Sequence, residues 1–210
     1  MKLNPLFLSG LVALGGAVSA QAQAVYSINT VGYVNLDIPA GFSMIANPLD
    51  AGDNTLNNVI QSAPDFTTIY KFNPSNGTYD TISSFDQASG QWSNGDAITL
   101  APGEGAFIAT LSAFTLTFSG EVMQGELSNP LPAGYSIVSS QVPQEGTLQS
   151  LGYTGNNGDT VYQFNGTSYV INTYFNGSFL PSEPNIGIGE AFFVNRVSAG
   201  SWDRNFSTDQ

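Results

Sequence analysis

Two glutamates at matching positions are the residues in this chain best suited to acid–base chemistry. Glu104 follows Gly103, Glu190 follows Gly189, and an apolar segment comes after each. A pair of carboxylates can cleave a glycosidic bond when they lie ~5–10 Å apart, one as the acid and the other as base or nucleophile. A glycine–glutamate turn that occurs twice through duplication explains the pair more simply. We therefore expect turn residues, and an Asp/Glu-dependent glycoside-acting enzyme is the third candidate function.

The composition excludes most other catalytic chemistry. The 210 residues contain no Cys and no His. The chain therefore has no zinc ligands of the usual kind, no thiol nucleophile and no Ser-His-Asp triad. Lys and Arg number 4 against 16 Asp and Glu, a formal net charge of −12. So few cations cannot neutralise many phosphates, which excludes nucleic acid as a partner. The sequence predicts a protein that is not an enzyme.

One loop gathers oxygen ligands. Asp50, Asp53 and Asn54 lie close together around a glycine, and calcium takes carboxylate and amide oxygens from such loops. Calcium is the only cofactor that the sequence suggests. The alternative is a solvated loop in which Asp53 or Asn54 caps a short helix over 54–61.

Aromatic residues make up 12% of the chain, enough to build a platform on which sugar rings could stack. In small β domains, however, most aromatic side chains fill the core or pair across strands. A carbohydrate- or surface-binding adhesin module is therefore the alternative function, with an extracellular polysaccharide as its partner. The candidates for glycan stacking are Tyr79, Trp92, Tyr153, Tyr174 and Trp202.

The body of the chain is a duplication. Residues 38–45 (Ile-Pro-Ala-Gly-Phe-Ser-Met-Ile) match 131–138 (Leu-Pro-Ala-Gly-Tyr-Ser-Ile-Val), and 68–73 match 160–165. Short alternating or β-branched segments separated by Asn-Gly turns indicate strands in both copies. The sequence predicts an all-β fold of two duplicated small β-sandwich or barrel modules packed together, with at most one short helix each. The modules span 25–118, with an N-terminal lead strand, and 119–210.

The order of these motifs resembles a known tandem module. Residues 39–48 (Pro-Ala-Gly-Phe-Ser-Met-Ile-Ala-Asn-Pro), 69–73 (Ile-Tyr-Lys-Phe-Asn) and 102–108 (Pro-Gly-Glu-Gly-Ala-Phe-Ile) carry the likeness. They are similar to a tandem all-β module of secreted and cell-surface proteins of Gram-negative bacteria, most of them without an assigned activity. The resemblance covers nearly the whole chain after residue 24. It implies an exported β protein of structural or adhesive type and carries no catalytic residues.

Residues 1–24 have the pattern of a secretory signal peptide. Lys2 precedes an apolar segment from Leu6 to Val18, and small residues suited to cleavage follow. The apolar run is too short to span ~30 Å of hydrocarbon. We expect a secreted protein, extracellular or on the cell surface, with no membrane span.

The segment after the signal peptide carries the most specific functional hypothesis. Residues 25–37 are rich in strand formers, and a free strand can complete a neighbour's sheet edge and build an open filament. Pairing within its own copy is the simpler expectation for this strand. The sequence thus favours a non-enzymatic structural protein whose partner is itself, assembling into an extracellular filament or surface layer. The candidate assembly residues are Tyr26, Ile28, Val31, Tyr33, Val34 and Leu36.

Overall fold

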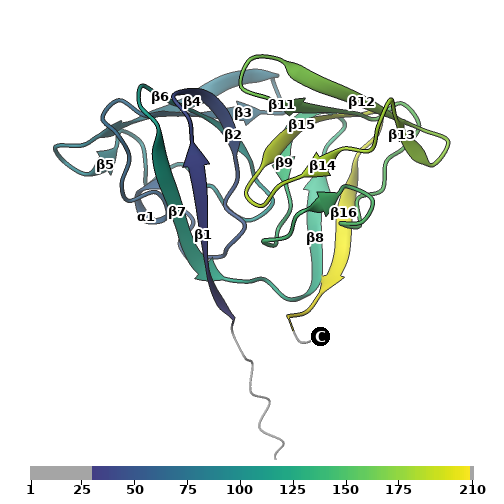
Figure 1. Ribbon diagram of the computed structural model, residues 1–210, viewed down its shortest axis with the longest axis horizontal. Coiled ribbons are helices and arrows are strands. Elements are labelled where there is room, and N and C mark those ends of the chain that lie inside the picture. Colours follow the sequence, from purple (N-terminus) through teal and green to yellow (C-terminus); the bar gives the residue numbers. More distant parts are fainter. Residues whose placement is uncertain (1–29, 209–210) are drawn as a thin grey trace, which may run out of the picture.

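The computed structural model describes residues 30–208, which form sixteen strands and one short helix. The predicted all-β fold class is confirmed. The predicted signal peptide and the candidate residues Tyr26 and Ile28 lie outside the described residues. No helix within 30–208 is long and apolar enough to cross a membrane. Figure 1 shows two groups of strands side by side, one from each half of the chain.

The first half folds into two sheets. Its elements are β1 (Val31–Ile38), β2 (Gly41–Ile45), α1 (Leu56–Val59), β3 (Thr68–Asn73), β4 (Thr78–Asp86), β5 (Gln91–Trp92), β6 (Ala106–Thr110) and β7 (Phe114–Glu121). β1 pairs with β7, and the other strands form a five-stranded sheet in the order β2-β6-β3-β4-β5. Because β7 continues to Glu121, the first half extends past the predicted boundary at residue 118.

Side-chain alternation along β1 and β7 explains where the core of this half lies. Val34 and Ile38 point inward from β1, Leu116 and Phe118 point inward from β7, and all four are buried. Their neighbours in sequence are more exposed, as the period of two in a half-buried strand requires. Ile69 from the five-stranded sheet belongs to the same core. Burying each such side chain is worth about 1.5–3 kcal/mol, so the apolar interior is the main stabilising element.

The second half repeats this arrangement. Its strands are β8 (Gly125–Leu131), β9 (Gly134–Ser139), β10 (Gly146–Thr147), β11 (Thr160–Phe164), β12 (Tyr169–Phe175), β13 (Ser178–Leu180), β14 (Asn185–Ile186), β15 (Ala191–Arg196) and β16 (Gly200–Phe206). β8 pairs with β16 as β1 does with β7, and the five-stranded sheet has the order β9-β15-β11-β12-β13. The short pair β10–β14 corresponds to the Thr55–Thr99 bridge of the first half. Both halves therefore have the same topology.

The single turn α1 is the only helix in the described residues. The predicted cap at Asp53 or Asn54 is wrong, because Thr55 occupies the N-cap position and makes no side-chain capping hydrogen bond. Asp53 Oδ1 instead accepts a hydrogen bond from the backbone N–H of Thr55 at 3.1 Å. The corresponding segment 148–151 of the second half is a hydrogen-bonded turn.

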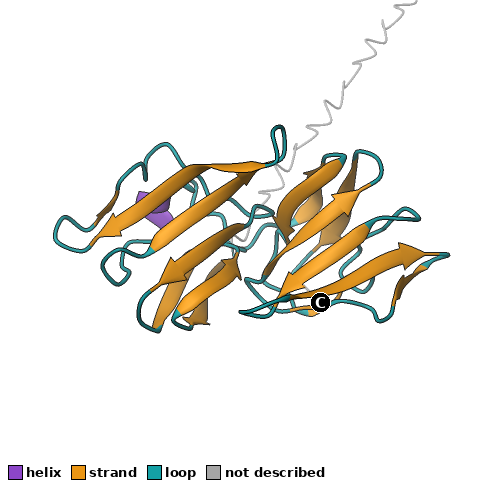
Figure 2. Cartoon of the chain, turned by 90° about the horizontal axis from the view of Figure 1, so that it is seen from above, coloured by secondary structure: helices purple, strands orange, loops and turns teal. Residues whose placement is uncertain are grey.

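Two equivalent contacts between a turn and a strand join the halves. The backbone N–H of Ala46 donates to the carbonyl of Gly189 at 2.8 Å, and that of Ser139 donates to the carbonyl of Gly103 at 3.0 Å. Ala46 and Ser139 occupy the same position in the two copies, as do the two glycines. The halves are thus related by a pseudo-two-fold axis through this joint, and Figure 2 shows the two groups of strands side by side.

The two joint glycines allow a close approach of backbone and side chain. Both have positive φ, +96° at Gly103 and +72° at Gly189. A Cβ on Gly103 would lie 2.8 Å from Asn129, and a Cβ on Gly189 would lie 2.7 Å from Leu36. Asn129 on β8 and Leu36 on β1 are equivalent positions, so the close approach is also repeated.

Each half has its own core, and a third cluster connects them. Met44 and Phe107 from the first half pack with Ile137 and Ala191 from the second. These side chains lie on the faces of the five-stranded sheets that point away from the two individual cores. The two modules therefore share apolar contacts in addition to the backbone contacts at the joint.

β1 pairs within its own half rather than standing free. Val31 to Ile38 pair in register with Glu121 to Phe114, and Thr117 Oγ1 donates to Asn35 Oδ1 at 2.7 Å. Val34 is buried in the core, whereas Val31 and Tyr33 face solvent. Donating this strand to a neighbour would remove Val34 from the core.

Candidate functional site

Glu104 and Glu190 each hold their own turn together. Oε2 of each carboxylate accepts a hydrogen bond from the backbone N–H three residues earlier, at 2.8 Å in both cases. Glu104 also lies 3.2 Å from Lys71 Nζ, and Glu190 accepts from Gln163 Nε2 at 3.0 Å. Lys71 and Gln163 occupy matching positions in the repeat, so the whole arrangement is duplicated. Burial lowers the pKa of Lys71, and Glu104 opposes that shift. These contacts account for both glutamates as turn-stabilising residues.

The side-chain oxygens of the predicted calcium loop accept hydrogen bonds from within the loop. Asp50 Oδ1 accepts from the backbone N–H two residues on and from Asn54 Nδ2, both at 2.8 Å. Asp53 Oδ1 also accepts from the backbone N–H two residues on. Asn54 thus turns its amide nitrogen toward Asp50, and its oxygen accepts from a backbone N–H at 3.1 Å. Within residues 30–208, no group of three or more acidic, His or Cys side chains is placed to hold a metal.

The prediction of glycan stacking is wrong for three of the five candidate residues. Trp92, Tyr153 and Trp202 are only 3%, 2% and 2% exposed, so none offers a ring face to a ligand. Each tryptophan donates its indole N–H to a buried backbone carbonyl, at 2.8 Å from Trp92 and 2.9 Å from Trp202. Tyr174 is half-buried and packs edge-on against Phe179. Tyr79, at 36% exposed, is the one predicted stacking residue in a surface cluster.

A different set of rings reaches the surface. Ring contacts connect residues on the outer faces of both five-stranded sheets into one cluster that crosses between the halves. Sequence reasoning missed all of its members except Tyr79, although four pairs of them align directly in the sequence repeat. We call this cluster the aromatic face; it consists of Phe42, Tyr70, Phe72, Tyr79 and Phe107 from the first half and Tyr135, Tyr162, Phe164, Tyr169 and Phe193 from the second.

The two halves pack these rings alike, with one chemical difference. The centroids of Phe42 and Tyr70 are 5.8 Å apart with planes at 41°, and those of Tyr135 and Tyr162 are 5.8 Å apart at 43°. The hydroxyls of Tyr135 and Tyr162 share a hydrogen bond of 3.3 Å, which Phe42 cannot make. That hydrogen bond, followed by burial, raises the pKa of Tyr162 to about 12.

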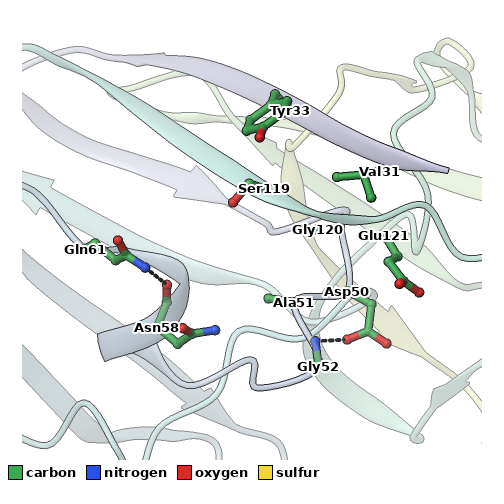
Figure 3. A pocket seen from close by; sticks show the side chains of 10 residues that line it. All are labelled: Val31, Tyr33, Asp50, Ala51, Gly52, Asn58, Gln61, Ser119, Gly120 and Glu121. Carbon is green, nitrogen blue, oxygen red and sulfur yellow. Dashed lines mark hydrogen bonds between the residues drawn. The ribbon is translucent and has the colours of Figure 1, made fainter. Parts of the chain in front are cut away.

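A polar groove of about 450 Å³ lies beside β1 and β7 (Figure 3). Tyr33 from β1 and Ser119 from β7 lie on one side of it. Asn58 from α1 and Gln61, which follows α1, lie on the other side. The carboxylates of Asp50 and Glu121 lie near one end. The groove is therefore lined by an aromatic ring, amides, a hydroxyl and two acids.

Several polar atoms in this groove are uncommitted. Tyr33 is 76% exposed. Asn58 Nδ2 donates to a backbone carbonyl at 2.6 Å, and Gln61 Nε2 donates to the Asn58 carbonyl at 3.1 Å. Asn58 Oδ1, Gln61 Oε1 and Ser119 Oγ make no hydrogen bond to any residue in the described part of the chain. These atoms are available to a ligand that carries hydroxyl groups.

The groove continues along β7 as a second hollow of about 300 Å³. The second hollow shares Tyr33, Asn58, Gln61 and Ser119 with the first. Its walls come from β1, from the segment around α1 and from β7, which are distant in sequence, so no local pattern could have revealed it. The further residues that line it are Val59, Ser62, Thr115, Leu116 and Thr117.

Comparison with protein-family models, curated proteins and solved structures gave no match.

Proposed function

We propose that this chain is an exported, non-enzymatic binding protein that holds a neutral polysaccharide in the groove beside β7. The observation that carries the proposal is Tyr33, an aromatic ring 76% exposed above a groove in which two amide oxygens and a serine hydroxyl have no hydrogen-bond partner among residues 30–208. Aromatic rings offer an apolar face, while amide and hydroxyl groups offer hydrogen bonds. A sugar ring needs both kinds of contact, because it has apolar C–H faces and a polar edge.

The charge of the protein favours a neutral glycan. Asp50 and Glu121 line one end of the groove, and the net charge of the chain is −12. An acidic polysaccharide would be repelled, particularly at low ionic strength. Carboxylates can still accept hydrogen bonds from the hydroxyls of an uncharged sugar.

The shape of the groove favours a chain over a single sugar. The groove follows β7, which has 8 residues, a length of ~26 Å at ~3.3 Å per residue. Hydroxyl side chains face outward along it from Thr115, Thr117 and Ser119. Such a groove accommodates several consecutive sugar units of a linear polymer.

The test is affinity electrophoresis of the mature protein in gels that contain neutral polysaccharides. We expect at least one to retard the protein, and Tyr33→Ala to weaken that binding about tenfold or more, as the loss of a central aromatic contact does. Tyr135→Ala, which removes a 46% exposed ring from the other half, is the matched control. Unchanged binding by Tyr33→Ala would move the site elsewhere, and failure with every neutral polysaccharide would reject the proposed function.

Self-association into a filament or surface layer is the second candidate function. The observation that favours it is the second edge of β1, which no strand pairs with among residues 30–208. An open strand edge is a template for another chain, and exposed Val31 and Tyr33 lie along it. Negative-stain microscopy of protein purified from its native surroundings tests this role. Regular filaments or sheets would support it, and dispersed single particles would argue against it.

A further inference from the structure

The aromatic face contains a cavity that the polysaccharide proposal does not use. Its volume is about 310 Å³, and the five residues that line it are all aromatic. Four belong to the first half, namely Phe42, Tyr70, Tyr79 and Phe107, and Phe164 reaches in from β11 of the second half. Among residues 30–208, no charged side chain lines the cavity. It lies on the outer face of the five-stranded sheet, whereas the groove lies beside the two-stranded sheet.

The rings stand at steep angles to one another and form a cage. Phe107 is 8% exposed and contacts three of the other rings. Its centroid is 6.3 Å from that of Phe42, 6.1 Å from Tyr79 and 5.3 Å from Phe164, with interplanar angles of 81°, 64° and 78°. Phe42 and Tyr79 are 49% and 36% exposed. Phe107 thus forms the floor of the cage, and Phe42 and Tyr79 form its rim.

The equivalent rings of the second half differ from the cage by one hydrogen bond. Tyr135 takes the place of Phe42, and its hydroxyl is hydrogen-bonded to Tyr162. Tyr162 also packs edge-on against Tyr169, with centroids 6.3 Å apart. The rings of Phe42 and Tyr70 in the first half pack at the same distance, 5.8 Å, but without a hydroxyl–hydroxyl hydrogen bond. Around Phe193 the second half repeats the ring arrangement, with Tyr135, Tyr169 and Phe72 at 6.4, 6.3 and 5.1 Å. The hydroxyl pair of Tyr135 and Tyr162 is the chemical feature that the first-half cage lacks.

We propose that this cage binds a quaternary ammonium cation, such as the N-trimethyl group of choline. The faces of aromatic rings attract a cation held within ~6 Å of their centroids, and clusters of several rings are suited to quaternary ammonium groups. Such a group has no N–H, so it loses little in a site that offers ring faces and no carboxylate. A primary amine or a hydrated metal ion would lose hydrogen bonds there. The net charge of −12 attracts cations to the protein as a whole.

The test is titration of the mature protein with choline, followed by proton NMR of the N-methyl signal. The neutral isostere 3,3-dimethylbutan-1-ol has the same shape without the charge. We expect choline to bind about tenfold more tightly than the isostere, since several rings each add to the attraction of the cation. We also expect its N-methyl signal to move upfield under the ring currents. Equal binding of the two compounds, or no binding of choline at millimolar concentration, would overturn the proposal.

Variants of the rim locate the site. Phe42→Leu and Tyr79→Leu each remove one exposed ring, and we expect each to weaken choline binding about fivefold or more. Phe175→Leu removes a ring that is 52% exposed and lies outside the aromatic face. It is the control, with choline affinity expected within about twofold of the unmodified protein. Choline binding that survives the double change Phe42→Leu with Tyr79→Leu would overturn the assignment.

Two further measurements test whether a loss of binding reflects misfolding, and whether the ligand is a lipid headgroup or a free cation. Tyr79→Phe keeps the ring and should retain choline binding, so a loss in this variant, with its fold intact by circular dichroism, would also overturn the assignment. Sedimentation with phosphatidylcholine vesicles distinguishes a lipid headgroup, which would carry the protein into the pellet, from a free cation. Failure of the cage would leave the polysaccharide proposal intact, because Tyr33 and the groove residues take no part in it.

Discussion

The rings of Phe107 and Phe193, which are equivalent residues of the two halves, meet with centroids 6.2 Å apart and planes at 53°. Each also contacts a second ring across the joint, Phe107 with Phe164 at 5.3 Å and Phe193 with Phe72 at 5.1 Å. The aromatic face therefore belongs to both halves at once. The affinity of a ligand bound there would therefore depend on the relative position of the two modules.

Alanine at Gly103, in the joint between the halves, is predicted to destabilise the protein more than alanine at a glycine of the same backbone conformation elsewhere. Gly103 and Gly166 both have φ of +96°, so alanine at either position costs about 1–2 kcal/mol in backbone strain. A Cβ on Gly103 would also meet buried Asn129, whereas a Cβ on Gly166 would meet nothing within 4 Å. We expect Gly103→Ala to lower the free energy of unfolding by about 1–3 kcal/mol more than Gly166→Ala, measured by urea denaturation. Equal losses would show that the joint adapts to the added methyl group.

The buried ion pair of the second half is predicted to be essential for stability. Arg196 Nε lies 3.4 Å from Asp159 Oδ2, and their side chains are 4% and 0% exposed. Arg196→Met leaves Asp159 buried without a counter-charge, so we expect a loss of about 3–5 kcal/mol in the free energy of unfolding. Arg204→Met is the control. It makes the same change in net charge at a half-buried arginine that bonds to Gln144 and Ser140. A similar loss in both variants would assign the effect to net charge.

The stability of the protein is predicted to fall between pH 10 and pH 12, in part through Tyr153. Burial raises the pKa of the Tyr153 hydroxyl to about 12, above the value of about 10 for an unfolded chain. The unfolded state therefore loses this proton at lower pH than the folded state does. The stabilisation from neutral Tyr153 is complete below about pH 10 and is lost as the pH rises toward about 12, up to about 2.7 kcal/mol.

Urea denaturation of Tyr153→Phe at a series of pH values measures that contribution. We expect the variant to show a smaller decline than the unmodified protein between pH 10 and pH 12. Tyr33→Phe, at a mostly exposed position, should decline as the unmodified protein does. An unchanged decline in Tyr153→Phe would assign the alkaline loss to other groups.

An engineered disulfide can decide between strand donation and pairing within the chain. The protein has no cysteine, so a single introduced pair reports only its own contact. Asn35 and Thr117 are partners in the β1–β7 register, with a hydrogen bond between their side chains. We expect Asn35→Cys with Thr117→Cys to form a crosslink within one chain, seen as a monomer on a non-reducing denaturing gel. Crosslinked dimers or ladders would show that β1 is exchanged between chains.

The fold could be predicted largely from the sequence, because its signals are local. The repeated segments 38–45 and 131–138 became the matching strands β2 and β9. The Asn165-Gly166 turn lies between the paired strands β11 and β12. Alternation between inward and outward side chains was visible in the strand-forming segments themselves.

The functional surfaces were harder to predict, since exposure depends on which elements cover a residue. Trp92 and Tyr79 are both aromatic residues on strands of the same sheet, yet one is buried and the other lies at the surface. Trp92 is covered because α1 ends beside it, and its indole N–H bonds to the carbonyl of Ile60. The groove likewise needs the chain around Asn58 to lie beside β7, a contact that no short motif encodes.

The reciprocal hydrogen bonds between the halves affect how the protein unfolds. Each half supplies a backbone acceptor to the other through Gly103 and Gly189. Each also covers part of the other's aromatic surface. A fragment that contained only one half would expose both an unpaired strand edge and apolar aromatic rings, and both features promote aggregation. We therefore expect the two halves to unfold together as one cooperative unit, which would limit the time that such an intermediate exists.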